Sequence, residues 1–288
     1  MALDLRAARH KVTELRRIVS GIPDPAVAFS GGVDSSLLAV VARDVHGDDM
    51  RAVIADSPSL PRNELAAAIR FADAHDLPLR VVRTAELEDP RYRSNGSDRC
   101  AFCKEALLEA VMTDPLLGSR TILLGVNLDD LADHRPGQRA ARDRGARFPL
   151  VEARLGKHEV RALAQDFHLE TWDKPAAACL ASRLAYGVPV SEEALNRIER
   201  AEASLRSLGF AGDVRVRDQG SGLARIEVPP ERFEDLLARR TEVIEGMREA
   251  GFRYVTLDLE GFRSGSHNLT ISTEELRTRL PRSPTDVR

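Results

Sequence analysis

The sequence predicts an α/β protein whose parallel sheet carries helices on both faces, followed by a smaller α+β domain. Short apolar runs alternate with segments of helical periodicity through the first half of the chain, and this alternation predicts the parallel sheet. After Gly187 the order changes to one helix, two strands, a second helix and a strand, which predicts a separate domain. We therefore place a first domain at residues 1–187 and a second at residues 188–288.

Each element of the first domain has its own signal. Four apolar runs are predicted strands: Ala26 to Phe29, Ala52 to Ala55, Leu79 to Val82 and Thr121 to Val126. Apolar residues at helical spacing predict helices from Asp34 to Val45 and from Pro61 to His75. In a parallel sheet of this kind, ligands bind beyond the carboxyl ends of the strands.

The second domain begins with a helix that has clear end signals, an N-cap at Ser191 and a terminating glycine at Gly209. The elements expected after it are two strands, a helix and a strand: Val214 to Arg217, Leu223 to Val228, Glu231 to Ala250 and Tyr254 to Leu259. We expect the tail from Pro281 to Arg288 to be frayed.

Composition and charge argue against several classes of protein. Hydrophobic residues make up 43% of the 288 residues and charged residues 30%, which is typical of a globular protein. The net charge of −3 gives no basis for a nucleic-acid partner. The segment from Met1 to Lys11 carries charges throughout, unlike a signal peptide, and no stretch approaches the ~20 apolar residues of a membrane helix. We therefore expect a cytoplasmic protein without a membrane partner.

A polar, glycine-rich turn follows the first predicted strand directly. Gly31 and Gly32 let backbone N–H groups approach a ligand closely, and the N-terminus of the next helix adds about half a positive charge. The side chains that complete this candidate phosphate site are Ser30, Asp34, Ser35 and Ser36. The lysine of a Walker-type loop is absent. The structural alternative is a plain turn that caps a helix.

The chain has three cysteines, and an odd number in a reducing compartment favours free, metal-bound or catalytic thiols over disulfides. Cys100 and Cys103 form a C-x-x-C at the start of a helix predicted from Phe102 to Met112. We expect the helix N-terminus and the neighbouring Arg99 and Lys104 to favour thiolates.

Several uses of these thiols fit the spacing. A redox pair would need a preceding strand in a βαβ unit, and a zinc site would need further ligands. A cluster held by three cysteines, with one iron left open, fits the number present. The alternatives are packed cysteines with no chemistry, which also applies to Cys179, although Pro175 and Arg183 flank that residue with open backbone and positive charge.

Several segments together resemble the ATP-dependent sulfur transferase (LarE) family of the PP-loop ATP pyrophosphatases. The loop SGGVDSS is similar to their pyrophosphate loop. The matching segments span nearly the whole chain: Val27 to Ser36, Asp133 to Gly137, Glu159 to Gln165, Lys174 to Gly187, Ser207 to Phe210, Val214 to Arg217, Ala224 to Pro229 and Phe252 to Ser266. The resemblance implies an adenine nucleotide α-hydrolase-like fold and a homo-oligomer.

The resemblance also implies a reaction. ATP, with Mg²⁺, adenylates one carboxylate of a pyridinium mononucleotide that bears two carboxylates, and sulfur then displaces AMP to leave a thiocarboxylate. This step belongs to the biosynthesis of the nickel-pincer nucleotide cofactor of lactate racemase. Asp34 and the loop residues are expected to act on ATP, and Cys179 is expected to take part in sulfur transfer.

Members of the family differ in their sulfur source. Some sacrifice a cysteine at the position of Cys179 and are left with dehydroalanine, whereas others carry three cysteines and an iron–sulfur cluster. Because the C-x-x-C is present, we expect a [4Fe–4S] cluster on Cys100, Cys103 and Cys179, with a sulfide on the open iron as sulfur donor.

The nucleotide substrate needs a cradle for its own phosphate. Arg215 and Arg217 alternate along one predicted strand and therefore point to one face. With them we group Ser182, Arg183 and Arg263 as candidates for substrate phosphate binding. Without the resemblance, a solvated basic edge would be the simpler interpretation.

Two further functions compete with the small-molecule sulfur transferase. Asn127, Asp129 and Asp130 resemble a segment of the PP-loop tRNA thiolases, but the net charge, the lack of zinc knuckles and the C-terminal match argue against that class. A non-catalytic regulator would hold AMP or ATP without chemistry, and it would release no pyrophosphate when substrate is added.

Overall fold

The computed structural model describes residues 5–131, 141–175, 179–210 and 212–263. These residues form two compact units, Met1–Cys179 and Leu180–Arg288. The observed boundary between the units follows Cys179 and therefore lies before the predicted boundary after Gly187. The segments Asp133 to Gly137 and Pro281 to Arg288, named above, lie outside the described residues.

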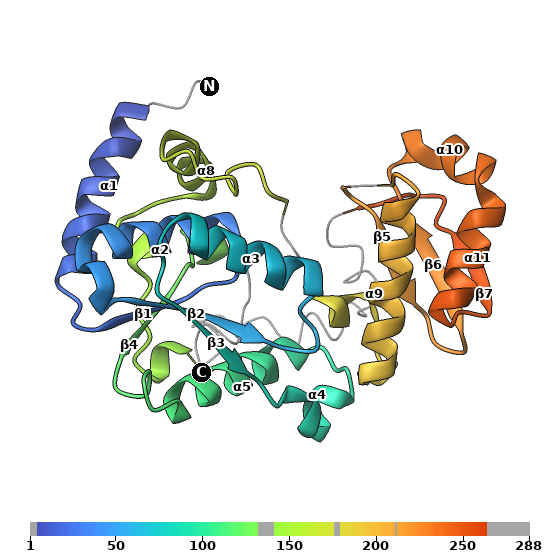
Figure 1. The fold of residues 1–288 in the computed structure, drawn as a ribbon, viewed down its shortest axis with the longest axis horizontal. Helices are drawn as coiled ribbons and strands as arrows, with labels where there is room; N and C mark the ends of the chain where they lie inside the picture. Colours follow the sequence, from blue (N-terminus) through green and yellow to red (C-terminus); the bar gives the residue numbers. More distant parts are fainter. Residues whose placement is uncertain (1–4, 132–140, 176–178, 211, 264–288) are drawn as a thin grey trace, which may run out of the picture. The chain divides into compact units, whose positions relative to one another are not determined.

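The first unit is built on a parallel sheet with the strand order β3-β2-β1-β4 (Figure 1). Its strands are β1 (Pro25–Ala28), β2 (Arg51–Asp56), β3 (Leu79–Arg83) and β4 (Thr121–Leu124). All three neighbouring pairs in this order are parallel, which confirms the predicted α/β fold. Each predicted strand is present, although β4 ends at Leu124 rather than Val126.

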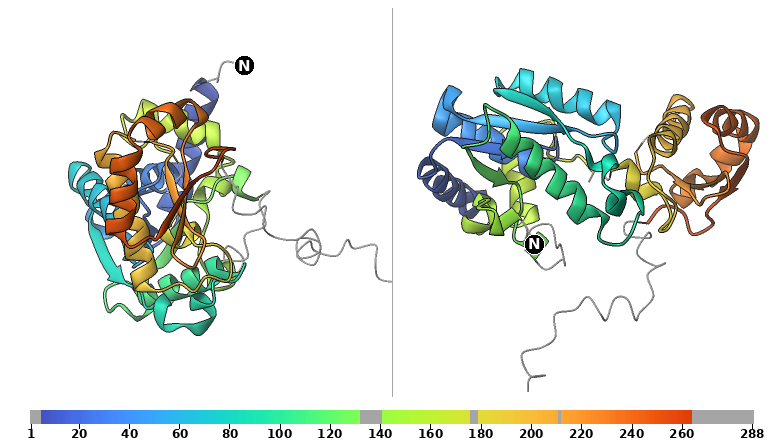
Figure 2. Two further views of the ribbon diagram at one scale, coloured as in Figure 1. Left: turned by 90° about the vertical axis from the view of Figure 1, so that its right-hand side faces the viewer. Right: turned by 90° about the horizontal axis from the view of Figure 1, so that it is seen from below.

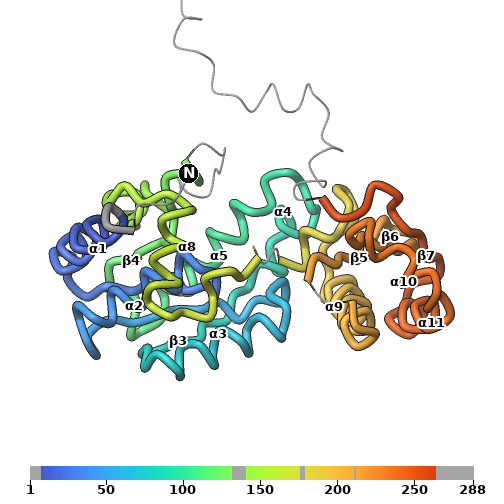
Figure 3. Tube along the Cα trace, turned by 90° about the horizontal axis from the view of Figure 1, so that it is seen from above, coloured from blue at the N-terminus to red at the C-terminus, as the bar shows by residue number. Residues whose placement is uncertain are grey.

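Helices cover both faces of this sheet because neighbouring strand residues point to opposite sides. Ala52 and Ile54 join the large core with α1, α2, α3 and α8, whereas Val53 packs with Val111 of α5 on the other face. Figure 2 shows α5 crossing that second face, and Figure 3 shows α1, α2 and α8 side by side. The helices among the described residues of this unit are α1 (Leu5–Ser20), α2 (Val33–His46), α3 (Arg62–Ala74), α4 (Pro90–Arg93), α5 (Arg99–Thr113), α7 (Pro149–Glu152) and α8 (Lys157–Asp166), with 3₁₀ turns η1 (Gly47–Asp49), η2 (Glu86–Glu88) and η3 (Asp129–Leu131).

The connections reverse direction at one place in the sheet. From β1 the chain proceeds through α2 to β2 on one side, whereas β4 returns to pair with β1 on the other side. The carboxyl ends of β1 and β4 therefore border the switch point at which open α/β sheets bind ligands. The loop after β1 and the segment after β4 meet there.

The second unit contains a three-stranded sheet with the order β5-β6-β7, antiparallel between β5 and β6 and parallel between β6 and β7. Its elements are η4 (Leu180–Arg183), α9 (Glu192–Ser207), β5 (Arg215–Asp218), β6 (Leu223–Glu227), η5 (Pro230–Arg232), α10 (Phe233–Ala238), α11 (Arg240–Ala250) and β7 (Tyr254–Leu257). This matches the predicted α+β order.

The structure corrects one predicted helix and adds another. The single helix predicted from Glu231 to Ala250 is wrong, because Arg239 leaves helical geometry and separates α10 from α11. The Arg239 side chain donates a hydrogen bond to the carbonyl oxygen of Leu208 (2.6 Å), a tertiary contact that periodicity does not reveal. The added helix is α1, for which we had identified no signal. Among the described helices, none has the length and apolar character needed to cross a membrane.

Candidate active site

The loop between β1 and α2 folds around its own serine side chains. Gly31 has a φ of +69°, which favours glycine, and Gly32 is extended immediately before the helix. The hydroxyl of Ser35 donates to the carbonyl oxygen of Gly32 (3.0 Å) and accepts from the backbone N–H of Ser30 (3.1 Å). Ser36 is fully buried, and its hydroxyl has no hydrogen-bond partner among the described residues. The loop is therefore preorganised at the N-terminus of α2, the end of a helix that favours anions.

Close backbone packing surrounds this loop. A Cβ atom on Gly31 would lie 3.0 Å from the Cβ of Ala68 in α3. A Cβ atom on Gly125, directly after β4, would lie 2.8 Å from the backbone nitrogen of Ser35. Both distances are shorter than ordinary carbon contacts, so these glycines allow α3 and the end of β4 to approach the loop.

Asp34 stands in the first turn of α2 with both carboxylate oxygens engaged. The side-chain amide of Asn127 donates to Oδ1 (2.9 Å), and the Nζ atom of Lys157 donates to Oδ2 (2.5 Å). A second lysine, Lys174, donates to the carbonyl oxygen of Gly31 (3.0 Å) and pairs with Glu64 (2.8 Å). The loop has no lysine of its own, yet the fold brings two to it from distant segments. Our sequence analysis assigned neither lysine a role.

The segment after β4 is a tight polar turn. The side-chain oxygen of Asn127 accepts from the backbone N–H groups of Asp129 (3.0 Å) and Asp130 (3.2 Å). Asp129 in turn accepts from the backbone N–H of Lys157 (2.5 Å), which fixes the start of α8 beside the turn. In the sequence, Asn127, Asp129 and Asp130 were noted only for their resemblance to a segment of the tRNA thiolases, and the structure shows that Asn127 orients Asp34.

The three thiols lie in the first unit, with Cys100 exposed and Cys103 and Cys179 partly buried. Burial, with smaller effects from Cys179, Glu86 and Cys100, raises the pKa of the Cys103 thiol to about 12. The expectation that Cys103 is held as a thiolate is therefore wrong for the metal-free protein. The helix N-terminus and Arg99 do not offset the loss of water around the sulfur.

A buried polar group that we had not predicted lies next to Cys103. Glu86 is 1% exposed and accepts a short hydrogen bond from the hydroxyl of Ser57, and Ser59 shares another with the hydroxyl of Tyr92. The second carboxylate oxygen of Glu86 has no hydrogen-bond partner within the described part of the chain. Burial, followed by smaller effects that include the charges of Cys179, Cys103 and Glu86, raises the pKa of Tyr92. These groups place the thiols near the segments that follow β2 and β3.

The donor set suits an iron–sulfur cluster, since thiolates are its usual ligands. The charges of both Cys100 and Cys179 act on Cys103, so the three sulfur atoms share one neighbourhood. Within the described ranges, however, no three Cys, His, Asp or Glu side chains lie close enough together to hold a single metal ion.

Three of the predicted phosphate-binding arginines lie together in the second unit, but they differ in whether a carboxylate pairs with them. Arg183 pairs with Glu202 (2.9 Å), and Arg217 makes a two-pronged contact with Glu227 (3.0 and 2.9 Å). Arg215 has no carboxylate partner among the described residues. Burial and then the charge of Arg183 lower the pKa of Arg215. An unpaired, half-buried guanidinium beside two other arginines is suited to an anion.

The remaining two predicted residues differ in their placement. Ser182 lies among the arginines, since its backbone oxygen accepts from Arg217 (2.8 Å) and its hydroxyl accepts from Arg183 (3.3 Å). Arg263 instead pairs with Glu260 three residues earlier and is largely exposed. The structure therefore brings Ser182, Arg183, Arg215 and Arg217 together, and it shows no contact of Arg263 with them.

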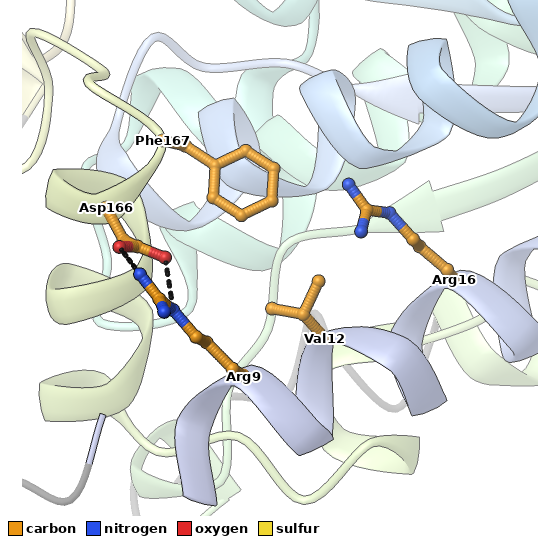
Figure 4. A pocket seen from close by; sticks show the side chains of 5 residues that line it. All are labelled: Arg9, Val12, Arg16, Asp166 and Phe167. Carbon is orange, nitrogen blue, oxygen red and sulfur yellow. Dashed lines mark hydrogen bonds and ion pairs between the residues drawn. The ribbon is translucent and has the colours of Figure 1, made fainter. Parts of the chain in front are cut away.

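A separate open pocket lies at the other end of α8 from Lys157 (Figure 4). Arg9, Val12 and Arg16 of α1 face Asp166 and Phe167 across it, and Arg9 pairs with Asp166 (2.6 Å). Arg16 lies over the ring of Phe167 (5.6 Å) and pairs with Asp44 (2.9 Å). Each charged group of this pocket is already paired, so we assign it no ligand.

The fold and the site define an α/β protein with a preorganised loop at the switch point of its sheet and three thiols in the same unit. No protein-family model matches the chain. Three curated proteins are similar over most of its length. One is the pyridinium-3,5-bisthiocarboxylic acid mononucleotide synthase of Lactiplantibacillus plantarum, 38% identical over 88% of this chain and 91% of the relative. The chain therefore belongs to the family of this synthase.

The two other relatives carry no functional name. The protein slr1717 of Synechocystis is 43% identical over 91% of this chain and 98% of its own length. The protein MJ0830 of Methanocaldococcus jannaschii is 28% identical over 83% of this chain and 90% of its own length. The similarity extends across both compact units in each case.

Proposed function

We propose that the protein is an ATP-dependent sulfur transferase that makes a thiocarboxylate on a pyridinium dicarboxylate mononucleotide, a step in nickel-pincer nucleotide biosynthesis. The observation that carries the proposal is the 38% identity to a synthase whose name specifies a pyridinium bisthiocarboxylic acid mononucleotide. The loop at the switch point and the three thiols supply groups for activation and for sulfur transfer.

The proposed first step is adenylation of the substrate carboxylate, with release of pyrophosphate. A carboxylate is a poor electrophile, and joining its oxygen to AMP turns that oxygen into a good leaving group. In this proposal the backbone of Ser30 to Ser36 and the N-terminus of α2 hold the phosphates of ATP, and the anion-favouring end of the helix supports it. Asp34 is the carboxylate available to bind Mg²⁺ there.

The proposed second step is sulfur transfer with release of AMP. Cys100, Cys103 and Cys179 would hold a [4Fe–4S] cluster, which would supply a sulfide on its open iron. The alternative donor is the sulfur of Cys179 itself, which would leave dehydroalanine at that position. In either case we assign the phosphate of the substrate to Arg215, which has no carboxylate partner among the described residues and lies beside Arg183 and Arg217.

One experiment tests the proposal and separates the two sulfur sources. Protein purified without oxygen is incubated with ATP, Mg²⁺ and the pyridinium dicarboxylate mononucleotide, and pyrophosphate, thiocarboxylate and protein mass are measured. The proposal requires both products, and it fails if neither forms. Loss of H₂S, about 34 Da by atomic composition, from Cys179 would identify the sacrificial route.

The cysteine variants give the matching control. If the cluster is the donor, changing any of the three cysteines to alanine removes both the iron and repeated turnover. If Cys179 is consumed, the Cys100→Ala/Cys103→Ala variant keeps full activity and only Cys179→Ala is inactive. Full activity of that double variant would reject the cluster and keep the sulfur-transfer function.

A further inference from the structure

We infer that Lys157 is an exchangeable counter-ion of the phosphate loop. Its ammonium group pairs with Asp34 (2.5 Å), and by this inference it moves to the phosphates of ATP when Mg²⁺ binds Asp34. This inference rests on the proposed ATP chemistry and adds a residue to which neither the resemblance nor the relatives assign a role.

The first observation is the position of Lys157 at the start of α8. A helix N-terminus carries a partial positive charge, so a lysine there is electrostatically unfavourable unless an anion lies nearby. The nearby anion is Asp34, whose Oδ2 atom lies 2.5 Å from Nζ. The lysine is therefore stabilised in this place by the carboxylate of the loop, which belongs to a different helix.

The second observation is that the base of the Lys157 side chain is fixed while its end is accessible. Its backbone N–H donates to Asp129 (2.5 Å), which holds the Cα atom beside the turn after β4. The side chain is 37% exposed, and that of Asp34 is 17% exposed, so solutes can reach the pair. A long, flexible side chain anchored in this way can exchange one anion for another without movement of the backbone.

The third observation is that the two lysines near the loop, Lys174 and Lys157, make different contacts. Lys174 bridges the carbonyl oxygen of Gly31 and the carboxylate of Glu64, so its charge serves to hold the loop against α3. In the described structure, Lys157 makes an ion pair with Asp34 alone. Asp34 by itself would repel a phosphate, and it therefore needs a cation in both the empty and the loaded state.

If Lys157 exchanges between Asp34 and the phosphates of ATP, its removal should have an effect that the removal of a purely structural ion pair would not have. Lys157 and a divalent cation compete for the Oδ2 atom of Asp34, so removal of the lysine should strengthen cation binding to the nucleotide-free protein. The same removal takes a positive charge from the phosphates, so it should weaken ATP binding. The two ligands therefore respond in opposite directions.

The test uses the full-length protein and the Lys157→Met variant. Mn²⁺ binding without nucleotide is followed by its electron paramagnetic resonance signal, and ATP binding with Mg²⁺ is followed by calorimetry. We expect Kd for ATP to rise about 10-fold to 100-fold and Kd for Mn²⁺ to fall about 10-fold. Lys157→Arg keeps the charge and should bind both ligands within a few-fold of wild type.

Lys11→Met is the matched control, because Lys11 also pairs with a residue of α8, Glu159 (2.6 Å), at a similar exposure. It should change neither ligand. If Lys157→Met binds ATP as wild type does, or if both ligands weaken together, the inference is overturned while the proposed function stands. If the wild-type protein does not bind ATP, the inference and the proposed ATP chemistry fail together.

Discussion

Gly125 and Ser35 touch through their backbones, since a Cβ atom on Gly125 would lie 2.8 Å from the Ser35 nitrogen. This contact joins the end of β4 to the first turn of α2. It leaves no room for a side chain between the two segments that border the switch point. The position of the phosphate loop therefore depends on a glycine outside the loop itself.

Gly125→Ala should shift the loop and destabilise the protein by about 1–3 kcal/mol, because overpacked backbone must move apart. Pyrophosphate formation should fall as well. Thermal unfolding and a pyrophosphate assay measure the two effects. Gly21→Ala is the control, since a Cβ there meets its nearest atom at 3.6 Å, an ordinary contact. Equal melting temperatures for the two variants would show that β4 does not press on the loop.

Gly32→Ala should separate folding from ATP use. A Cβ atom there would lie 3.4 Å from the hydroxyl of Ser30, and Gly32 has an ordinary φ of −90°, so the empty protein tolerates it. The added methyl group would nevertheless stand where the backbone is expected to meet phosphate. We expect an unchanged melting temperature and no pyrophosphate formation. Normal pyrophosphate formation would show that the loop is not the phosphate site.

Substitution of Arg215 and of Arg217 by alanine should have different effects on substrate binding and on stability. Arg215→Ala removes a charge that has no carboxylate partner among the described residues, so it should weaken binding of the phosphorylated substrate about 10-fold to 100-fold and cost less stability than Arg217→Ala. Arg217→Ala leaves Glu227 fully buried with Arg225 as its remaining partner, so unfolding should become easier by about 3 kcal/mol. Calorimetry and chemical denaturation measure these quantities. A similar loss of stability in both variants would contradict the assignment.

The raised pKa of Cys103 predicts how stability depends on pH in the metal-free protein. An unfolded thiol has a pKa of about 8.5, whereas the folded Cys103 thiol has a pKa of about 12. Between these values the unfolded chain releases a proton that the folded chain keeps, so stability falls as pH rises. Relative to Cys103→Ala, the wild type should lose about 1 kcal/mol between pH 7 and 9.5. Denaturant titrations measure the free energy of unfolding of both proteins at each pH. If it depends on pH in the same way for wild type and Cys103→Ala, the raised pKa of Cys103 is contradicted.

Sequence patterns predicted the sheet because each strand is a short apolar run next to a turn. The loop could be found because glycines and serines follow directly after an apolar strand. The thiols could be found because the chain has only three cysteines, two of them in a C-x-x-C. Lys157 and Lys174 could not be assigned a role in this way, because a lysine gives no local sign of the carboxylate that it will meet. Glu86 was missed for a related reason. Glu86 is buried where η2 packs against α4 and α5, and its carboxylate meets Ser57 after β2, so no single window of sequence contains these contacts.

The helices of the second unit show the same difference between local signals and distant contacts. Helix α9 was predicted with its N-cap because Ser191 and the apolar stripe lie next to each other in the chain. The break at Arg239 was not predicted, because the contact that accompanies it involves Leu208 in a different element. Local signals thus predicted the strands of both sheets and helix α9, whereas contacts between distant segments determined where α10 and α11 separate and which charged side chains pair.

The pairing of β1 with β4 has a consequence for how the chain reaches this fold. Strand β1 forms early in synthesis, but its second neighbour is made only after α5 has been completed. Until then one edge of a buried strand is unpaired, and contacts between distant segments slow folding. Asn127, which orients Asp34, arrives with β4. Nucleotide binding should therefore appear only after β4 has docked, and it would report that step.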